Sequence, residues 1–541
     1  MNVFLITPLL VLFSIESSYN KIMKNKLSVT KSSTLRPSVT ATASLVTALS
    51  VAERGLGFLY RIVLSRLLGA EGLGLYQVSL SLFSVFLTIG TGGIPLCVSR
   101  LISKSKAEHD CFGERYVVSS GLALCMALTI PVCIVMGLFG QYFTFLFSDE
   151  RSVVLFKILL TGLAFSALYA VFRGYFWGNN RFLLPSFLEI AEETVMVIAG
   201  VLLLQNVQSS MDGATKATYA VILSYAFSFT ASTVCFFISG GKLASPKRAL
   251  KPLIRSAMPI TAVRASSSLV NSAIAVLLPA MLIRAGFSQT DAIKAFGVVT
   301  GMAMPVLFIP ATIIGSLALV LVPRLSEDFY GKNTKRLYEN MRRGLRVSFL
   351  VACALMPFFA VLGDEVGLIA FASMEAGEFI RAGAPLLLPL ALTMISTSIL
   401  NSMGFERQTF VFYFISAAAL LLCILFLPAV CGVYAYLWGM AASYTLNAVC
   451  NFCFLFTHCK GLFRLRSLFT FRAEYRALLS AAVAFIVGSV ISPVMKTYLG
   501  ETLSAFCIGG AMALVLCVLY ALFQLVPMQS LFHKRKKKLA F

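Results

Sequence analysis

The chain has 541 residues, of which 58% are hydrophobic and 13% are charged, and its mean hydropathy is +0.87. About a quarter of the residues of a soluble domain are charged, so this composition excludes a soluble globular protein, a disordered chain and a nucleic-acid-binding domain. The net charge of +22 is instead typical of a membrane protein whose loops on one side are basic.

Fourteen apolar stretches predict an all-α polytopic membrane protein, because about 20 apolar residues span the hydrocarbon core as a helix. The connections are short, and none could hold a folded catalytic domain. Residues 1–40 precede the first helix and are predicted to form a poorly ordered or interfacial extension. The predicted helices cover residues 41–64, 75–98, 116–140, 153–178, 182–205, 217–240, 256–283, 295–322, 347–370, 382–403, 408–428, 432–456, 477–495 and 502–525.

The basic residues alternate between the two sides of this arrangement. Of the 45 lysines and arginines, 34 fall on the side of the N-terminal tail, seven on the other side and four within helices. This count assigns Arg173 to the connection after 153–178. Cytoplasmic loops carry the excess of Lys and Arg. We therefore expect a multi-pass protein of the bacterial plasma membrane with both termini in the cytoplasm.

Charged residues inside the predicted helices are the main candidates for a functional site. An ionisable group at the bilayer centre costs about 2.5–3.5 kcal/mol on insertion scales, so it needs a partner or a water-filled cavity. The basic set is Arg54, Arg61 and Arg264, and the acidic set is Glu53, Glu189, Glu192 and Glu193. One hypothesis is a structural ion-pair network between helices 41–64 and 182–205. The other is a polar cavity whose arginines bind a phosphate or diphosphate, while the glutamates balance charge, bind a cation or accept a proton.

Short matches suggest an internal repeat. The helix ends Val98–Leu101 and Val322–Leu325 resemble each other, as do the turns Gly178–Arg181 and Gly404–Arg407. Each element lies six helices after its counterpart, so both copies have the same orientation, and a site is expected between the halves near the midplane. The predicted domains are 41–240 (six helices), 241–457 (six helices), 458–526 (two lipid-tail helices) and 527–541 (basic cytoplasmic tail).

Helix-breaking residues lie in two predicted helices of this repeat. Backbone groups freed by Pro or Gly inside a membrane need other partners, so these positions are either packing kinks or bending points that let two lobes rock. The candidate hinge residues are Gly92, Gly93, Pro95, Pro305 and Pro310.

Motifs for enzymes and ATP-driven pumps are absent: the chain contains no GxxxxGK[ST], no HExxH and no G-x-S-x-G. The glycine-rich GAEGLG at 69–74 does not match GxGxxG and is expected in an outer loop. We therefore predict a transporter, not an enzyme. It needs no cofactor or metal and would be driven by Na⁺, H⁺, the membrane potential or the gradient of its substrate.

Three segments resemble the stage V sporulation protein B-like polysaccharide transporters. They are GLGFLYRIVLSRLLGAEGLGLYQ at 55–77, FRGYFWGNNRFLLPS at 172–186 and TGMAMPVLFIPATIIGSLALVLVPRLSE at 300–327. These transporters belong to the multidrug/oligosaccharidyl-lipid/polysaccharide (MOP) superfamily, as do the lipid II flippases. The resemblance implies a MATE/MOP-like fold with fourteen helices, two pseudo-symmetric six-helix lobes plus two C-terminal helices, and alternating access.

The resemblance also implies a lipid-linked sugar bearing a diphosphate as the substrate. In the lipid II flippases, basic residues line a central cavity, and the last two helices form a groove for the lipid tail. Arg54, Arg61 and Arg264 are the positions here that match the cavity role. The chain departs from the family pattern at Asn271, where an acidic residue is common, and at Val197, where an arginine is common.

The resulting hypothesis is a flippase that moves an undecaprenyl-diphosphate-linked peptidoglycan precursor or other oligosaccharide to the outer leaflet. Arg54, Arg61, Arg264 and Asn271 would bind the substrate, and membrane lipids would be the other partner of a monomeric protein. The alternatives are an ion-coupled drug/cation antiporter of the MATE type, a membrane enzyme of polysaccharide synthesis, and a non-transporting scaffold for envelope or spore assembly.

Overall fold

The computed structural model describes residues 39–108, 113–139, 147–458 and 471–525, together with positions 142 and 144. Helices make up nearly all of this part of the chain, and it contains no β-strand. The helices, with short 3-10 or π segments labelled η, are α2 (Val39–Thr91), α3 (Ile94–Ala107), α4 (Gly113–Phe139), α5 (Glu150–Gly178), α6 (Leu183–Leu203), η2 (Leu204–Asn206), α7 (Ser210–Ile238), α8 (Lys247–Arg284), α9 (Gln289–Phe296), η3 (Gly297–Ala303), α10 (Met304–Leu307), α11 (Ile309–Tyr330), α12 (Thr334–Phe371), α13 (Met374–Gly383), η4 (Ala384–Leu386), α14 (Leu387–Ser402), α15 (Glu406–Phe426), α16 (Pro428–Cys431), α17 (Tyr434–His458), α19 (Phe471–Tyr498) and α20 (Glu501–Leu522).

Thirteen helices in the described ranges are long and apolar enough to cross a membrane. This number corresponds to the fourteen predicted spans. One of the thirteen, residues 45–107, runs over α2 and α3 and contains two of the predicted spans, whereas residues 289–330 provide two of the thirteen where one span was predicted. The helix α6 is not counted among the thirteen because its 21 residues include three glutamates. The predicted all-α polytopic membrane class is therefore confirmed.

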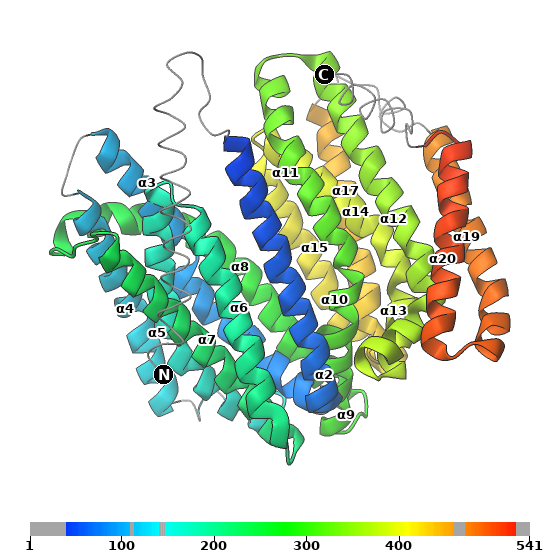
Figure 1. Ribbon diagram of the computed structural model, residues 1–541, viewed down its shortest axis with the longest axis horizontal. Helices are drawn as coiled ribbons and strands as arrows, with labels where there is room; N and C mark the ends of the chain where they lie inside the picture. Colours follow the sequence, from blue (N-terminus) through cyan, green and yellow to red (C-terminus); the bar gives the residue numbers. More distant parts are fainter. Residues whose placement is uncertain are drawn as a thin grey trace, which may run out of the picture. The chain divides into compact units, whose positions relative to one another are not determined.

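The contacts within the chain divide it after Val276 into two compact units. The N-terminal unit contains α2 to α7 and most of α8. Its central helix is α5, which packs against α2, α3, α4 and α7 (Figure 1). The predicted domain limits at 240, 457 and 526 remain predictions.

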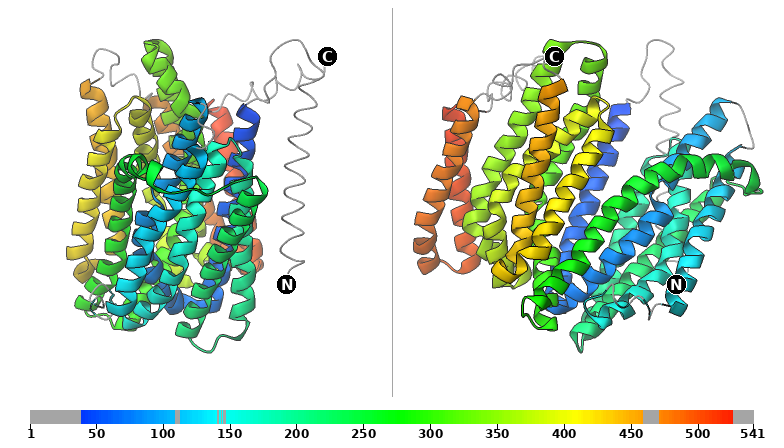
Figure 2. Two further views of the ribbon diagram at one scale, coloured as in Figure 1. Left: turned by 90° about the vertical axis from the view of Figure 1, so that its left-hand side faces the viewer. Right: turned by 180° about the vertical axis from the view of Figure 1, so that it is seen from behind.

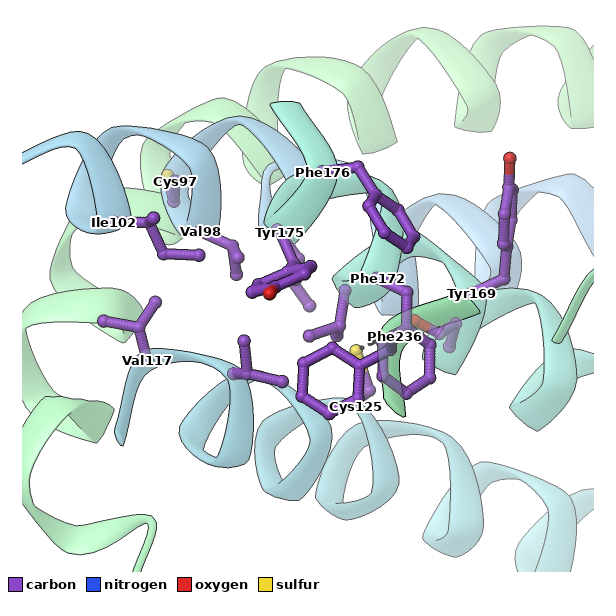
Figure 3. Packing of buried hydrophobic residues seen from close by; sticks show 14 of the residues in the cluster. Cys97, Val98, Ile102, Val117, Cys125, Tyr169, Phe172, Tyr175, Phe176 and Phe236 are labelled. Carbon is purple, nitrogen blue, oxygen red and sulfur yellow. Dashed lines mark hydrogen bonds between the residues drawn. The ribbon is translucent and has the colours of Figure 1, made fainter. Parts of the chain in front are cut away.

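An apolar core holds one end of the N-terminal unit together. Phe172 and Tyr175 of α5 pack against Phe236 of α7, and Phe176 packs against Tyr175 (Figure 3). Tyr169 lies at the edge of the same cluster, with its hydroxyl directed away from the apolar side chains. Each buried aromatic side chain removes a large apolar area from lipid and water alike and packs at close range. The core therefore fixes the position of α5, which carries part of the site described below.

The C-terminal unit is organised around α12, which packs against α11, α13, α14 and α19. The last two helices, α19 and α20, form a pair beside α12 (Figure 2). The buried carboxylate of Glu365 on α12 lies 2.5 Å from the Lys496 ammonium group on α19. This ion pair connects α19 to α12, and the apolar contacts of Leu362 with Ile508 and Met512 connect α20 to α12.

Two turns that the sequence repeat aligns have the same backbone conformation. The helix α5 ends before Asn180 (φ 59°), and α14 ends before Gly404 (φ 86°). In each case the residue after this left-handed position donates its N–H to a carbonyl five residues earlier, from Arg181 to Phe176 and from Phe405 to Leu400. This is the usual way of closing a helix C-terminus. The common turn supports the repeat, with Asn180, rather than Gly178, as the counterpart of Gly404.

The predicted outer loop at 65–74 is wrong. The helix α2 runs from Val39 to Thr91 and has non-helical geometry only at Gly69 (φ 66°, ψ 179°). Glycine adopts this positive φ at little cost, so one residue is enough to redirect the helix. Gly72 follows within helical structure, where a Cβ would lie 2.9 Å from the Ser210 carbonyl oxygen. The glycines of GAEGLG therefore serve a bend and a close helix contact.

Two predictions fall outside the described residues. The extension at 1–40 lies there except for its last two residues, and so does the whole of the basic tail at 527–541. The cytoplasmic location of both termini therefore stays a prediction.

Candidate functional site

An acidic cavity lies inside the N-terminal unit and has a volume of about 240 Å³. Side chains of α2, α5, α6 and α7 line it. All four residues of the predicted acidic set line this one cavity, although they come from two helices far apart in the sequence. The lining residues are Glu53, Leu87, Thr91, Ser166, Tyr169, Ala170, Arg173, Glu189, Glu192, Glu193 and Tyr225.

The geometry of α6 explains why three of these carboxylates converge. Glu189, Glu192 and Glu193 are spaced i, i+3 and i+4, and residues at these spacings share one face of a helix. This face of α6 packs against α2 and α7. The bend of α2 at Gly69 brings Glu53 of its first half to the same cavity as Leu87 and Thr91 of its second half.

Arg173 is the basic residue of the cavity, and the sequence interpretation missed it. It was counted with the connection after 153–178, but it lies inside α5, five residues before the helix ends at Gly178. Its Nη1 donates to Glu189 Oε1 at 3.0 Å. The guanidinium carbon lies 5.9 Å from the ring centre of Tyr169 and 5.2 Å from that of Trp177. An arginine within an apolar run of 26 predicted helical residues was the signal that could have found it.

The remaining carboxylates have fewer partners. Glu192 Oε2 accepts a hydrogen bond of 2.5 Å from the Ser228 hydroxyl of α7. Glu193 Oε2 is buried without a hydrogen-bond partner, and so is the hydroxyl oxygen of Tyr169. No lysine or arginine of the described residues lies within 4.0 Å of the carboxylates of Glu53, Glu192 or Glu193. The cavity therefore contains three carboxyl groups that its own arginine does not neutralise.

The predicted basic set is not part of this cavity. Arg54 and Arg61 of α2 and Arg264 of α8 are all exposed, and so is Asn271. Within the described ranges, none of the three arginines forms an ion pair with a carboxylate. The ion-pair network proposed between helices 41–64 and 182–205 therefore does not involve Arg54 or Arg61.

Arg54 and Arg264 lie at the same level of the N-terminal unit. Glu53, the neighbour of Arg54, shares the cavity with Leu87 and Thr91. On α8, Ser268 bonds to Thr88 at 2.8 Å, and Thr261 accepts a bond of 3.0 Å from the Gly93 N–H. Arg264 lies between these two contact residues on α8, so the backbone positions of both arginines are close in level to residues 87–93. Arg61 lies seven residues from Arg54, about two helical turns away on the same face.

The candidate hinge residues lie at breaks in the helices. Gly92 and Gly93 separate α2 from α3, and Pro95 is in the first turn of α3. Pro305 is in the first turn of α10, a helix that begins directly after the π segment η3. Pro310 is in the first turn of α11, which begins directly after Phe308. Proline is tolerated in a first turn because its missing N–H would have no helical partner there. Whether these breaks bend during transport stays a prediction.

Gly93 also allows α8 to approach closely, which leads to a prediction about stability. A Cβ at this position would lie 2.6 Å from the Ala257 carbonyl oxygen and 2.9 Å from Thr261 Oγ1. We expect Gly93→Ala to lower the free energy of unfolding by about 1–3 kcal/mol, as overpacking does. Thermal unfolding of the purified protein in detergent measures this effect. Gly55→Ala is the control, because a Cβ at Gly55 has no neighbour within 4 Å; equal unfolding temperatures for the two variants would contradict the prediction.

Comparison with known proteins agrees with this architecture. The model of the polysaccharide biosynthesis protein family matches residues 39–329, which is more than half of the chain. The chain therefore belongs to this family. Stage V sporulation protein B of Bacillus subtilis is 25% identical over 401 residues, which cover 66% of this chain and 74% of that protein. The lipid II flippase MurJ of Bacillus subtilis is 22% identical over 338 residues, covering 58% of this chain and 62% of the flippase.

Solved structures show the same fold. The lipid II flippase MurJ in an inward closed conformation aligns with a TM-score of 0.68 at 14% identity, over 88% of this chain and 99% of the flippase. An inward-facing MATE family multidrug resistance transporter of the MOP superfamily aligns with a TM-score of 0.64 at 15% identity, over 76% of this chain and 95% of the transporter. The chain is thus a multi-pass membrane protein with the MOP-superfamily transporter fold, as predicted.

Proposed function

We propose that this protein is a flippase that moves a lipid-linked, diphosphate-bearing oligosaccharide across the plasma membrane by alternating access. The observation that carries the proposal is the exposure of Arg54, Arg61 and Arg264 within membrane helices, with no carboxylate of the described residues at ion-pair distance. Unpaired guanidinium groups are costly at membrane depth unless they face water or an anionic ligand. A diphosphate is a suitable ligand because guanidinium groups bind phosphate oxygens with two parallel hydrogen bonds.

The chemistry of the substrate explains why a protein is needed. The sugar hydroxyls and the diphosphate charge cannot cross hydrocarbon without compensation. In the proposed mechanism, the arginines neutralise the diphosphate while Asn271 and water contact the polar head group. The prenyl chain stays in lipid, along α19 and α20, whose surfaces expose apolar side chains such as Ile486, Val490 and Leu514. A peptidoglycan precursor linked to undecaprenyl diphosphate is our specific proposal, and transport would run from the cytoplasmic to the outer leaflet.

The acidic cavity is the candidate for energy coupling. A cavity with three unneutralised carboxyl groups attracts a monovalent cation or a proton, and the chain has no ATP-binding motif. Uptake and release of Na⁺ or H⁺ at Glu53, Glu189, Glu192 and Glu193 would bias the conformational cycle, with the membrane potential as a further driving force. The protein would act as a monomer, with both termini in the cytoplasm.

One observation favours a second function. The cavity of the N-terminal unit is acidic, and the fold is shared with a MATE family multidrug transporter. An antiporter that exchanges an organic cation for H⁺ or Na⁺ would use such a cavity. Ion-gradient-dependent efflux of a fluorescent organic cation from proteoliposomes would support this function in place of the flippase.

Complementation in bacteria tests the flippase proposal. We expect the full-length chain to restore growth to a strain depleted of its lipid II flippases, and the variant Arg54→Ala/Arg264→Ala to fail at equal membrane abundance. Lys157→Ala is the matched control, because Lys157 is also an exposed basic residue of a membrane helix but belongs to neither set. Growth with the double variant equal to that of the wild type would contradict the role of the arginines.

A further inference from the structure

We propose that Arg173 is a fixed counter-cation of the acidic cavity and determines how many mobile monovalent cations the cavity takes up. The inference rests on the proposed ion coupling and names the residue that sets its stoichiometry. The mobile cation is H⁺ or Na⁺; both would neutralise a carboxylate in the same place.

The contacts of Arg173 hold its charge in one position. Its guanidinium group donates to Glu189 at 3.0 Å and lies over the rings of Tyr169 and Trp177 at 5.9 and 5.2 Å. Such cation–π contacts strengthen when the groups are shielded from water. Because arginine is not deprotonated in proteins, this positive charge is permanent. Arg173 can therefore neutralise one carboxylate but cannot leave during a transport cycle.

The charges of the cavity then determine what must be supplied from outside. Four glutamates line the cavity, and Arg173 pairs with Glu189. Glu192 has the Ser228 hydroxyl as a neutral partner, and Glu53 and Glu193 form no ion pair within the described part of the chain. The exposed Arg54 and Arg61 of α2 are the other basic groups nearby, beyond ion-pair distance. Burying charge without compensation costs several kcal/mol per ion, so up to three mobile cations can be accommodated.

Tyr169 provides an independent indication that the cavity takes up a ligand. This side chain is 6% exposed, lines the cavity and has a hydroxyl oxygen without a hydrogen-bond partner. Its hydroxyl points away from the apolar cluster (Figure 3). Buried polar atoms are nearly always hydrogen-bonded, so this oxygen is expected to bind water or a cation. Neutral oxygens beside carboxylates form the ligand set that hard cations prefer.

Charge variants separate this role from a purely structural ion pair. Arg173→Gln leaves four carboxylates without a fixed cation. Glu189→Gln leaves three carboxylates and a guanidinium group without its partner, a net of two negative charges. The double variant Arg173→Gln/Glu189→Gln lacks the ion pair but retains three unneutralised carboxylates, as in the wild type. A structural role predicts that the double variant resembles Arg173→Gln; a counter-cation role predicts that it resembles the wild type.

The experiment measures cation-dependent thermal stabilisation of the purified full-length protein in detergent. One arm replaces choline chloride with NaCl at constant ionic strength, and the other varies pH in choline chloride. In the arm to which the wild type responds, we expect Arg173→Gln to reduce the half-maximal cation concentration roughly tenfold, a typical coupling between neighbouring sites. Glu189→Gln should increase it, the double variant should return it to the wild-type value, and Arg173→Lys should leave it nearly unchanged.

Two results would overturn the inference. One is a double variant whose half-maximal cation concentration equals that of Arg173→Gln. The other is a half-maximal concentration that is the same in all variants, or a wild type that neither cation stabilises. Failure of the proposed ion coupling would be seen in a different measurement, namely transport that does not depend on Na⁺ or H⁺. The ordered shifts in thermal stability among the variants could still occur in that case. If Arg173→Gln does not fold, the comparison of the double variant with Glu189→Gln retains the test.

Discussion

Replacing both Arg54 and Arg264 with alanine is expected to slow transport of the lipid-linked substrate at least about a hundredfold. Each charge-assisted hydrogen bond contributes about 1.5–3 kcal/mol, and about 1.4 kcal/mol corresponds to a factor of ten. Both residues are exposed within membrane helices, and the proposed function has each of them bind the diphosphate. The initial rate of flipping in proteoliposomes measures the effect, and each single variant should lose about tenfold or more.

The control for this prediction is Lys157→Ala, which removes an exposed positive charge from α5. It should flip the substrate at the wild-type rate, because lysine near a helix end can extend its ammonium group to the membrane interface. Normal flipping by the double variant at normal abundance would show that the two arginines do not bind the passenger.

Glu193→Gln is expected to uncouple transport from the ion gradient. Glu193 has a buried carboxylate oxygen without a hydrogen-bond partner and no ion-pair partner among the described residues, so a mobile cation is its natural counter-ion. Glutamine keeps the shape but removes the charge. We expect the acceleration of flipping by an imposed Na⁺ or H⁺ gradient to fall by about tenfold, corresponding to loss of roughly 1.4 kcal/mol of coupling, while downhill transport persists.

Glu501→Gln is the matched control for this prediction, because Glu501 is an exposed carboxylate in the first turn of α20. Its gradient response should equal that of the wild type. An unchanged response of Glu193→Gln to both gradients would exclude this glutamate from ion coupling and would shift attention to Glu53 and Glu192.

Much of the fold follows from local patterns in the sequence. Long apolar stretches must form helices in a membrane, since backbone polar groups have no other partners there, and this rule alone yields nearly all of the observed helices. The convergence of Glu189, Glu192 and Glu193 follows from helical spacing. The addition of Glu53 to the same cavity requires the bend at Gly69, which a sequence pattern does not reveal because glycine occurs in both loops and helices.

Other features depend on contacts between distant segments. Arg173 was assigned to a connection because it lies near the end of its apolar stretch, and only the packing of α5 against α6 and α7 shows that it faces the carboxylates. The arginines of the basic set and the glutamates were considered as possible partners, but they occupy different surroundings. The glutamates are partly buried and line one cavity, while Arg54, Arg61 and Arg264 are exposed. Charge type and spacing could not distinguish these environments.

The most direct test of the central claim is a comparison of substrates with the purified wild-type protein in proteoliposomes. A fluorescent sugar linked to undecaprenyl diphosphate and the same sugar linked to a neutral prenyl chain are each assayed for accessibility to a membrane-impermeant reagent. We predict rapid exposure of the diphosphate-linked sugar, and little movement of the neutral analogue. Equal movement of both lipids, or of neither, would contradict an account in which guanidinium groups carry a phosphorylated passenger.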